Sequence, residues 1–348
     1  MADAEDLAPH DRLLRRGWTT GACATAAAKA AHMALTTGHF PDPVTITLPG
    51  GQNPAFALAQ EALGEGFAEA GIIKDAGDDP DVTHGALVIA RVAPGAPGSG
   101  VSFHAGEGVG MVTKPGLPIP PGEPAINPVP RRMIREVLGD GDYAVTISIR
   151  DGARLAEKTW NPRLGIVGGL SVLGTTGIVV PYSCAAWIAS IQRGVDVARA
   201  MGLDHVVGST GDMSEKAAMA RLGLPVEAYL DMGDFVGGML KYLKRHPVPR
   251  VTIAGGFAKL VKLAQGAMDL HSGRSIVDFE MLATLLPEQR EAVLAANTAN
   301  EVLGLGGPAL ATKIAHLARE KAQAMLGEAG RVGVLVVDRG GTIVGESG

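Results

Sequence analysis

The sequence contains little cysteine, few aromatic residues and no long apolar run. Two cysteines, Cys23 and Cys184, cannot form a disulfide framework, and they fit a reducing compartment. Aromatic residues make up only 4% of the chain, so the core must be mainly aliphatic. Glycine or charge interrupts the longest apolar runs, which argues against a membrane-spanning helix, and the acidic N-terminus lacks the apolar segment of a signal peptide. These absences predict a cytoplasmic protein with no membrane partner.

An excess of positive charge is also missing. The chain has 31 Lys and Arg against 36 Asp and Glu, a formal net charge of −5, which argues against nucleic acid as a partner. Glycine and proline are plentiful instead, with 48 and 22 residues scattered between periodic segments, and they predict many tight loops. A length of 348 residues favours two domains, and a homo-oligomer is compatible with these numbers.

One stretch near the N-terminus combines features of a helix and of an anion site. It reads Gly17-Trp-Thr-Thr-Gly-Ala-Cys-Ala-Thr-Ala-Ala-Ala-Lys29, and the alanine run predicts a closely packed helix that stops at Gly38. Thr19 or Thr20 can cap the free N–H groups of the first turn, and the same groups can hold an anion or favour a Cys23 thiolate. The basic residues in and before this stretch are Arg15, Arg16 and Lys29. A capped core helix and an anion-binding helix end both remain open.

An acidic loop follows, Lys74-Asp-Ala-Gly-Asp-Asp-Pro-Asp-Val-Thr-His-Gly85. Clustered carboxylates can bind a divalent cation, although the spacing does not match an EF-hand. Alternatively, Asp75, Asp79 or His84 could move protons in a catalytic loop. The third alternative is a set of turns in which aspartates bond their own backbone.

The pattern of elements changes near residue 160. Residues 1–160 are rich in predicted strands, with one helix over the alanine run of residues 22–34 and another over residues 131–138, and they predict an α+β domain. In residues 161–348 strands alternate with helices, which predicts an α/β, Rossmann-like domain with a mainly parallel sheet. The overall fold class is therefore α/β and α+β in two domains.

Three predicted strands of the second domain, near residues 205–207, 226–230 and 250–254, end in small or acidic loops. Because ligands bind at the carboxyl ends of parallel strands, these loops predict a ligand crevice, although loops of this kind also occur without a ligand. A capping box of Asp212 and Glu215 is expected after the first strand. The predicted crevice residues are Ser209, Thr210, Asp212, Asp231, Asp234, Gly255 and Gly256.

A glycine-rich segment at residues 165–177 resembles a phosphate-binding loop in part. Gly169, Gly174, Thr175 and Thr176 fit the spacing of a P-loop, but the lysine that should contact the β- and γ-phosphates is absent. The loop can contact an anion or another ligand, or it is an ordinary turn. A P-loop-like nucleotide-binding protein therefore stays an alternative.

Together with the motifs at residues 106–117 and 122–131, these segments resemble the cobalt-precorrin-5B (C1)-methyltransferase family, CbiD, over most of the chain. The resemblance implies methyl transfer from S-adenosylmethionine to ring carbon 1 of a corrinoid precursor in cobalamin biosynthesis. It implies cobalt only as part of the substrate and no metal site in the protein. The alternative from another class is a non-catalytic tetrapyrrole-binding protein.

The resemblance also suggests roles for the residues singled out above. Asp75, Asp79 and His84 are the catalytic candidates. The acidic arms of the substrate would be bound by Arg15, Arg16, Thr19, Thr20, Lys29, Lys114 and Arg131. The methyl donor would be bound by Gly174, Thr175, Thr176, Ser209, Thr210, Asp231, Gly255 and Gly256.

Overall fold

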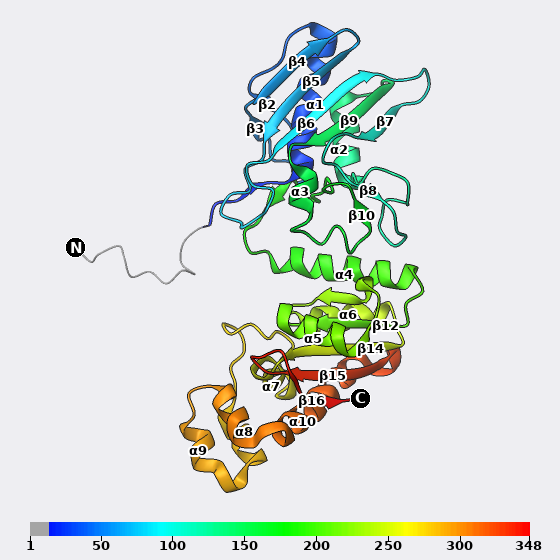
Figure 1. Cartoon of the computed structure of the whole chain (residues 1–348). Helices are drawn as coiled ribbons and strands as arrows, with labels where there is room; N and C mark the ends of the chain where they lie inside the picture. The colour runs from blue at the N-terminus through cyan, green and yellow to red at the C-terminus, as the bar shows by residue number, and fades with distance from the viewer. Residues whose placement is uncertain (1–13) are drawn as a thin grey trace, which may run out of the picture. The chain divides into compact units, whose positions relative to one another are not determined.

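The structure, a computed structural model, describes residues 14–348, so the acidic N-terminal segment lies outside the described residues. The chain forms two compact units, an N-terminal unit up to Ser183 and a C-terminal unit from Cys184 to Gly348 (Figure 1). The sequence predicts a domain boundary at residue 160. The compact units instead divide at Ser183, because β10 (Ile166–Val167) pairs with β8 (Met111–Val112) and β11 (Ile178–Val179) pairs with β1 (Gly17–Trp18).

The N-terminal unit is built on a mixed five-stranded sheet. Its strands lie in the order β4-β5-β6-β9-β7, and all neighbours are antiparallel except β7 and β9. The bounds are β4 (Gln60–Gly64), β5 (Phe67–Ile73), β6 (Leu87–Pro94), β7 (Val101–Ala105) and β9 (Tyr143–Ile149). The remaining elements are β2 (Val44–Thr45), β3 (Ala55–Phe56), α2 (Pro128–Leu138) and α3 (Gly152–Ala156).

The alanine-rich helix α1 (Thr20–Thr37) packs on β5, β6 and α2 and forms the centre of this unit. Thr19 is its N-cap and Gly38 its left-handed C-cap, which confirms the predicted start and stop. Its alanines are buried on nearly all sides, because a methyl side chain lets the sheet and α2 both approach closely. Helix α2 begins at Pro128, earlier than predicted, since proline is tolerated in a first turn.

The C-terminal unit contains a second five-stranded sheet, in the order β13-β12-β14-β15-β16. The first four strands are parallel and β16 is antiparallel to β15. The strands are β12 (His205–Ser209), β13 (Tyr229–Asp231), β14 (Arg250–Gly256), β15 (Arg331–Val337) and β16 (Ile343–Ser347). The helices are α4 (Cys184–Ala200), α5 (Asp212–Leu222), α6 (Val236–Arg245), α7 (Phe257–Ala264), α8 (Phe279–Leu285), α9 (Arg290–Ala295) and α10 (Ala299–Leu326).

The two faces of this sheet are covered by different helices. Val207, Tyr229 and Leu335 pack with α5 on one face. Val206, Leu230 and Ile253 pack with α4, α6, α7 and α10 on the other. The helix after β12 and the helix after the neighbouring β14 therefore lie on opposite faces. This arrangement marks the point where the order of strands reverses along the sheet.

The chain does follow β12, β13 and β14 each with a helix, as the alternating pattern predicts. The predicted capping box is wrong, because the N-cap of α5 is Gly211, and Asp212 instead accepts a hydrogen bond from Lys216 Nζ at 2.7 Å. Within residues 14–348, no helix combines the length and apolar character that crossing a membrane requires.

Candidate functional site

The N-terminus of α1 lies against the glycine-rich loop of residues 168–177. The backbone N–H of Thr19 donates to Gly177 O at 3.0 Å, and that of Gly21 donates to Leu173 O at 2.9 Å. Gly174 has a φ of +134°, and a Cβ at this position would lie 2.2 Å from Thr19 Oγ1, so only glycine fits. The structure thus brings Thr19 and Thr20 together with the loop that carries Gly174, Thr175 and Thr176.

At this corner, where the N-terminus of α1 meets the loop of residues 168–177, Thr19 and Thr20 differ in the hydrogen bonds of their side chains. Thr19 Oγ1 accepts from Ala22 N at 3.2 Å as the helix cap. Thr20 is 6% exposed, and its hydroxyl makes no hydrogen bond to any residue from 14 to 348. The expected Cys23 thiolate is wrong: burial raises the pKa of this thiol to about 12. Thr20 is therefore the polar side chain of this helix end that stays available.

The acidic loop is held to the strand that precedes α1. Arg15 pairs with both carboxylate oxygens of Asp75, with Nη2 2.9 Å from Oδ1, and the Arg15 backbone N–H donates to Asp78 Oδ2 at 2.7 Å. Hydrogen bonds from Arg15 and from the Gly77 backbone lower the pKa of Asp75 to about 2. Asp75 is therefore held as an anion at neutral pH.

The other carboxylates of the loop are engaged as well. Asp79 Oδ1 accepts the backbone N–H of Tyr182 at 2.8 Å. Asp81 pairs with Lys74, whose side chain is 1% exposed. Burial pushes the pKa of Asp81 up, but the Lys74 charge and hydrogen bonds from Lys74 and Thr83 outweigh it, so the pKa lies below its ordinary value. Within residues 14–348, no three His, Cys, Asp or Glu side chains gather as metal ligands.

His84 uses only one of its two ring nitrogens in hydrogen bonds to the described part of the chain. Its Nδ1 accepts the backbone N–H of Ala76 at 3.1 Å and lies 3.8 Å from Asp75 Oδ1. The neutral ring therefore carries its proton on Nε2, which bonds to no residue in the described part of the chain. His84 is about half exposed, so it can donate a hydrogen bond to a bound molecule.

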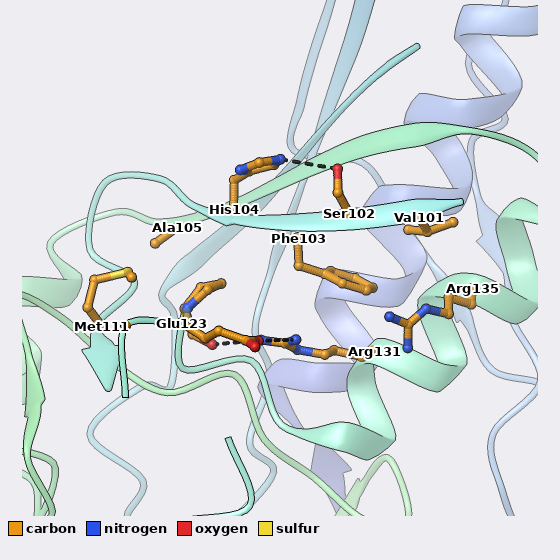
Figure 2. Close-up of a pocket in the computed structure, with 11 residues that line it drawn as sticks. Val101, Ser102, Phe103, His104, Ala105, Met111, Glu123, Arg131 and Arg135 are labelled. Carbon is orange, nitrogen blue, oxygen red and sulfur yellow. Dashed lines mark hydrogen bonds and ion pairs between the residues drawn. The ribbon is translucent and has the colours of Figure 1, made fainter. Parts of the chain in front are cut away.

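A second feature of the N-terminal unit is an open cavity of about 590 Å³ beside the edge strand β7. Its walls come from β7, Met111, residues 122–124 and two arginines of α2, Arg131 and Arg135. Figure 2 shows Phe103 pointing from β7 toward the arginines, while Ser102 and His104 point to the opposite side and bond to each other at 3.2 Å. The cavity thus joins an aromatic ring to two guanidinium groups.

The basic residues predicted to bind substrate are engaged to different degrees. Arg131 donates to Glu123 Oε2 at 2.6 Å, Ile126 O at 2.7 Å and Pro124 O at 3.0 Å. The donors of its guanidinium group are therefore used within the cavity wall. Lys29 Nζ donates to Thr45 O at 2.7 Å. Lys114 packs its side chain over Gly165. Arg16 is exposed, and the described residues offer its side chain no partner.

The C-terminal unit carries the other predicted ligand residues at the carboxyl ends of β12, β13 and β14. Ser209 ends β12, in register with Asp231 on β13 and Ala254 on β14. Its Oγ is buried and has no hydrogen-bond partner, although a buried hydroxyl normally finds one. Gly211 and Gly256 cap α5 and α7 without a side-chain cap, and a Cβ on either would meet no atom within 4 Å. These strand ends therefore offer open space at two glycines, backbone donors at two helix starts and one unsatisfied hydroxyl.

The acidic residues of this edge already make contacts. Asp234 pairs with Lys259 at 2.5 Å, and the Asp231 carbonyl accepts from Trp187 Nε1 at 2.9 Å. Gly255 passes close to Thr210, since a Cβ on it would lie 2.9 Å from Thr210 Cγ2. The residues predicted to bind the methyl donor thus fall into two groups, residues 174–176 in the N-terminal unit and the crevice group in the C-terminal unit.

Comparison with known proteins decides the family. The CbiD family model matches residues 8–181, and the model of the CbiD C-terminal domain matches residues 269–348. A cobalt-precorrin-5B C(1)-methyltransferase from Rhodospirillum rubrum is 62% identical over 99% of this chain and 100% of its own length. A relative of the same name from Brucella anthropi is 60% identical over 95% of both chains. The chain belongs to the CbiD family.

A solved CbiD structure is also similar to this chain. The cobalamin biosynthesis protein CbiD from Archaeoglobus fulgidus is 27% identical, with a TM-score of 0.39, over 75% of this chain and 83% of that one. In this chain, the N-terminal unit brings α1, the acidic loop and the glycine-rich loop together. The family motifs in the sequence had singled out each of these segments separately.

Two residues of the cavity in this CbiD protein are not predicted by any sequence motif. Phe103 and Arg135 line the cavity, but neither lies in a motif that indicates chemistry. A signal was present in the spacing, because Arg131 and Arg135 are four residues apart on a predicted helix and so share a face. The strand that supplies Phe103 could not be placed against that face from sequence.

Proposed function

We propose that this CbiD protein is a cobalt-precorrin-5B C(1)-methyltransferase of cobalamin biosynthesis. The observation that carries the proposal is the 62% identity to a protein of that name over the full length of both chains. The substrate is then a corrinoid with acidic arms, and cobalt arrives as part of it. We expect the enzyme to work in the cytoplasm, without nucleic acid or a membrane as partner, and a homo-oligomer fits the proposal.

We further propose that the C-terminal unit is a Rossmann-like domain that binds S-adenosylmethionine. The crevice between the ends of β12 and β14 is where such domains hold ligands, because the following helices leave on opposite faces. The unpartnered Ser209 hydroxyl suits a polar group of the donor, and the uncapped first turns after Gly211 and Gly256 suit its carboxylate. Thr210, Asp231 and Gly255 complete this proposed pocket, while Gly174, Thr175 and Thr176 remain candidates in the N-terminal unit.

The donor supplies an electrophilic methyl group on a sulfonium. Positioning then dominates the displacement, and little help from an acid or a base is compulsory. We assign Thr20 and the Nε2–H of His84 to orienting the corrinoid, Asp75 to a fixed negative charge, and Asp79 to holding the loop through Tyr182. Arg16 and Arg15 are the exposed basic residues next to the start of α1, and we assign Arg15, Arg16, Thr19 and Lys29 to the acidic arms of the corrinoid.

The direct test is methyl transfer by the purified full chain. Cobalt-precorrin-5B and S-adenosylmethionine labelled in its methyl group should give a labelled, heavier corrinoid. A tetrapyrrole carrier would bind the corrinoid and transfer no label, and a P-loop-like protein would hydrolyse nucleoside triphosphate above background. Either result would contradict the proposal.

Two variants examine the N-terminal corner in the same assay. Thr20→Ala and Asp79→Ala should lower turnover while the unfolding midpoint stays within a few degrees of wild type. Thr25→Ala is the matched control, because Thr25 lies on the same helix and bonds only Gly21 O at 2.8 Å. Full activity in both variants would remove this corner from the proposed site.

A further inference from the structure

We propose that the cavity beside β7 binds a carboxylate-bearing edge of the tetrapyrrole, with Arg135 as the residue that takes the carboxylate. This inference rests on the proposed function, because it needs a substrate with acidic arms. It adds Arg135, which the family motifs did not indicate, to a wall that includes the predicted substrate residue Arg131. The cavity lies wholly within the N-terminal unit, so its geometry is independent of the C-terminal unit.

The two arginines of the cavity have different roles although they lie one turn apart on α2. The guanidinium carbon of Arg131 lies 5.3 Å from the centre of the Phe103 ring, and that of Arg135 lies 4.9 Å from it. Arg131 donates hydrogen bonds to Glu123 and to the carbonyls of residues 124 and 126. Arg135 is exposed and, within residues 14–348, forms no ion pair or hydrogen bond through its side chain. Its planar fork is therefore available for a carboxylate.

The charges in the cavity favour an anion of this kind. Arg131 and Glu123 neutralise each other across 2.6 Å, which leaves the positive charge of Arg135 uncompensated in the wall. Phe103 holds Arg135 by a cation–π contact, so less side-chain entropy is lost when a ligand binds. A bound carboxylate would complete the ion pair that the protein does not supply.

The shape of the cavity fits part of a tetrapyrrole. The volume of about 590 Å³ is typical of a pocket for a drug-sized molecule. A tetrapyrrole macrocycle with all its arms is larger than such a molecule. Phe103 and Met111 offer an apolar wall for the ring edge or the stem of an arm, and Arg135 stands next to Phe103 (Figure 2). The cavity therefore holds one edge of the ligand and leaves the rest outside.

If Arg135 served only to stabilise α2, Arg135→Lys would bind a carboxylate ligand as well as wild type does. Arg135 lies in the last turn of α2, where any cation interacts favourably with the helix dipole. Arg135→Lys keeps this charge but lacks the fork that pairs with both oxygens of a carboxylate. Arg132→Gln is the matched control, because Arg132 lies on the same helix, pairs with Glu136 at 3.7 Å and does not line the cavity.

Binding of two cobalt corrins to the full-length protein tests the inference. The two ligands are cobyrinic acid, whose arms end in carboxylates, and cobinamide, whose arms end in amides. Each is titrated into the protein at low and high salt, and the tryptophan fluorescence of the protein reports binding. Wild type should prefer cobyrinic acid. Arg135→Gln should weaken its binding about tenfold or more and Arg135→Lys by less, with cobinamide binding and the thermal midpoint nearly unchanged.

The outcomes separate the two proposals. Equal losses in Arg132→Gln and Arg135→Gln, unchanged binding in Arg135→Gln, or no binding of cobyrinic acid by wild type would overturn the cavity assignment. Failure of methyl transfer with an intact Arg135-dependent preference for carboxylates would overturn the enzymatic proposal alone. Normal methyl transfer and an unchanged KM for cobalt-precorrin-5B in Arg135→Gln would overturn the cavity alone.

Discussion

Arg15 clamps Asp75 from 60 positions away in the sequence, pairing with both carboxylate oxygens and placing Nη2 2.9 Å from Oδ1. The pair ties the segment before α1 to the start of the acidic loop. A carboxylate held in this way is fixed in charge as well as in position.

We expect the contribution of Asp75 to stability to disappear in acid. Its pKa is lowered from 3.8 to about 2 on folding, so the stabilisation is present above about pH 4 and is lost as the pH falls through about 2. Because Asp75 is 42% exposed, Asp75→Asn should cost less than about 1 kcal/mol at pH 7. Urea unfolding of the N-terminal unit, followed by Trp18 and Trp160 in a Trp187→Phe background, measures the difference. A gap between wild type and Asp75→Asn that stays constant from pH 6 to pH 2 would contradict the pairing.

The buried ion pair of Lys74 and Asp81 should matter far more than an exposed one. Lys74→Met leaves the Asp81 carboxylate, 25% exposed, without its cation, and we expect a loss of about 3 kcal/mol in the free energy of unfolding. Arg132→Met breaks an exposed pair with Glu136 in the same unit and should cost below about 1 kcal/mol. Denaturant unfolding compares the two. Similar costs would mean that the burial of Lys74 does not decide the energy.

Ser209→Ala should separate stability from ligand binding. Removing a buried hydroxyl that has no partner should leave stability unchanged or raise it by up to about 1 kcal/mol. Affinity for S-adenosylhomocysteine should fall about 3- to 10-fold if the hydroxyl meets the ligand. Calorimetric titration and thermal unfolding of the same preparation give both values.

Ser347→Ala is the control for this experiment. Ser347, at the end of β16, forms a hydrogen bond between its Oγ and His316 Nδ1 at 2.8 Å. Losing this bond should lower the free energy of unfolding by about 1 kcal/mol and leave ligand affinity unchanged. Unchanged affinity in Ser209→Ala would place the donor elsewhere, and the loop of residues 174–176 would become the next candidate.

The two cysteines should differ in reactivity. Burial raises the pKa of Cys23 to about 12, so it is neither ionised nor accessible at pH 8, whereas Cys184 is partly exposed. A native sample treated with an alkylating reagent should carry one label, on Cys184, and an unfolded sample should carry two. Intact mass and peptide mapping count them. Labelling of native Cys184→Ser would show that α1 opens at its N-terminus.

The sequence by itself determined the features that depend on neighbouring residues. The start of α1 at Thr19 or Thr20, its end at Gly38, and the glycine and polar loops after β12 and β14 all follow from capping and turn chemistry within a few residues. Several motifs in order also indicated the CbiD family, which the full-length identity confirms. The roles given to Ser209 and His84 stay predictions.

Only the tertiary structure decided which polar groups remain available. Arg131 and Arg135 look alike in sequence, yet one is used by Glu123 and the other has no carboxylate among the described residues. Asp212 bonds Lys216 instead of capping α5, and residues 161–183 join the N-terminal unit through β10 and β11. The reason is physical: a helix cap forms from groups a few residues apart, whereas an ion pair, a buried hydroxyl or a cavity depends on which distant segments the fold brings into contact.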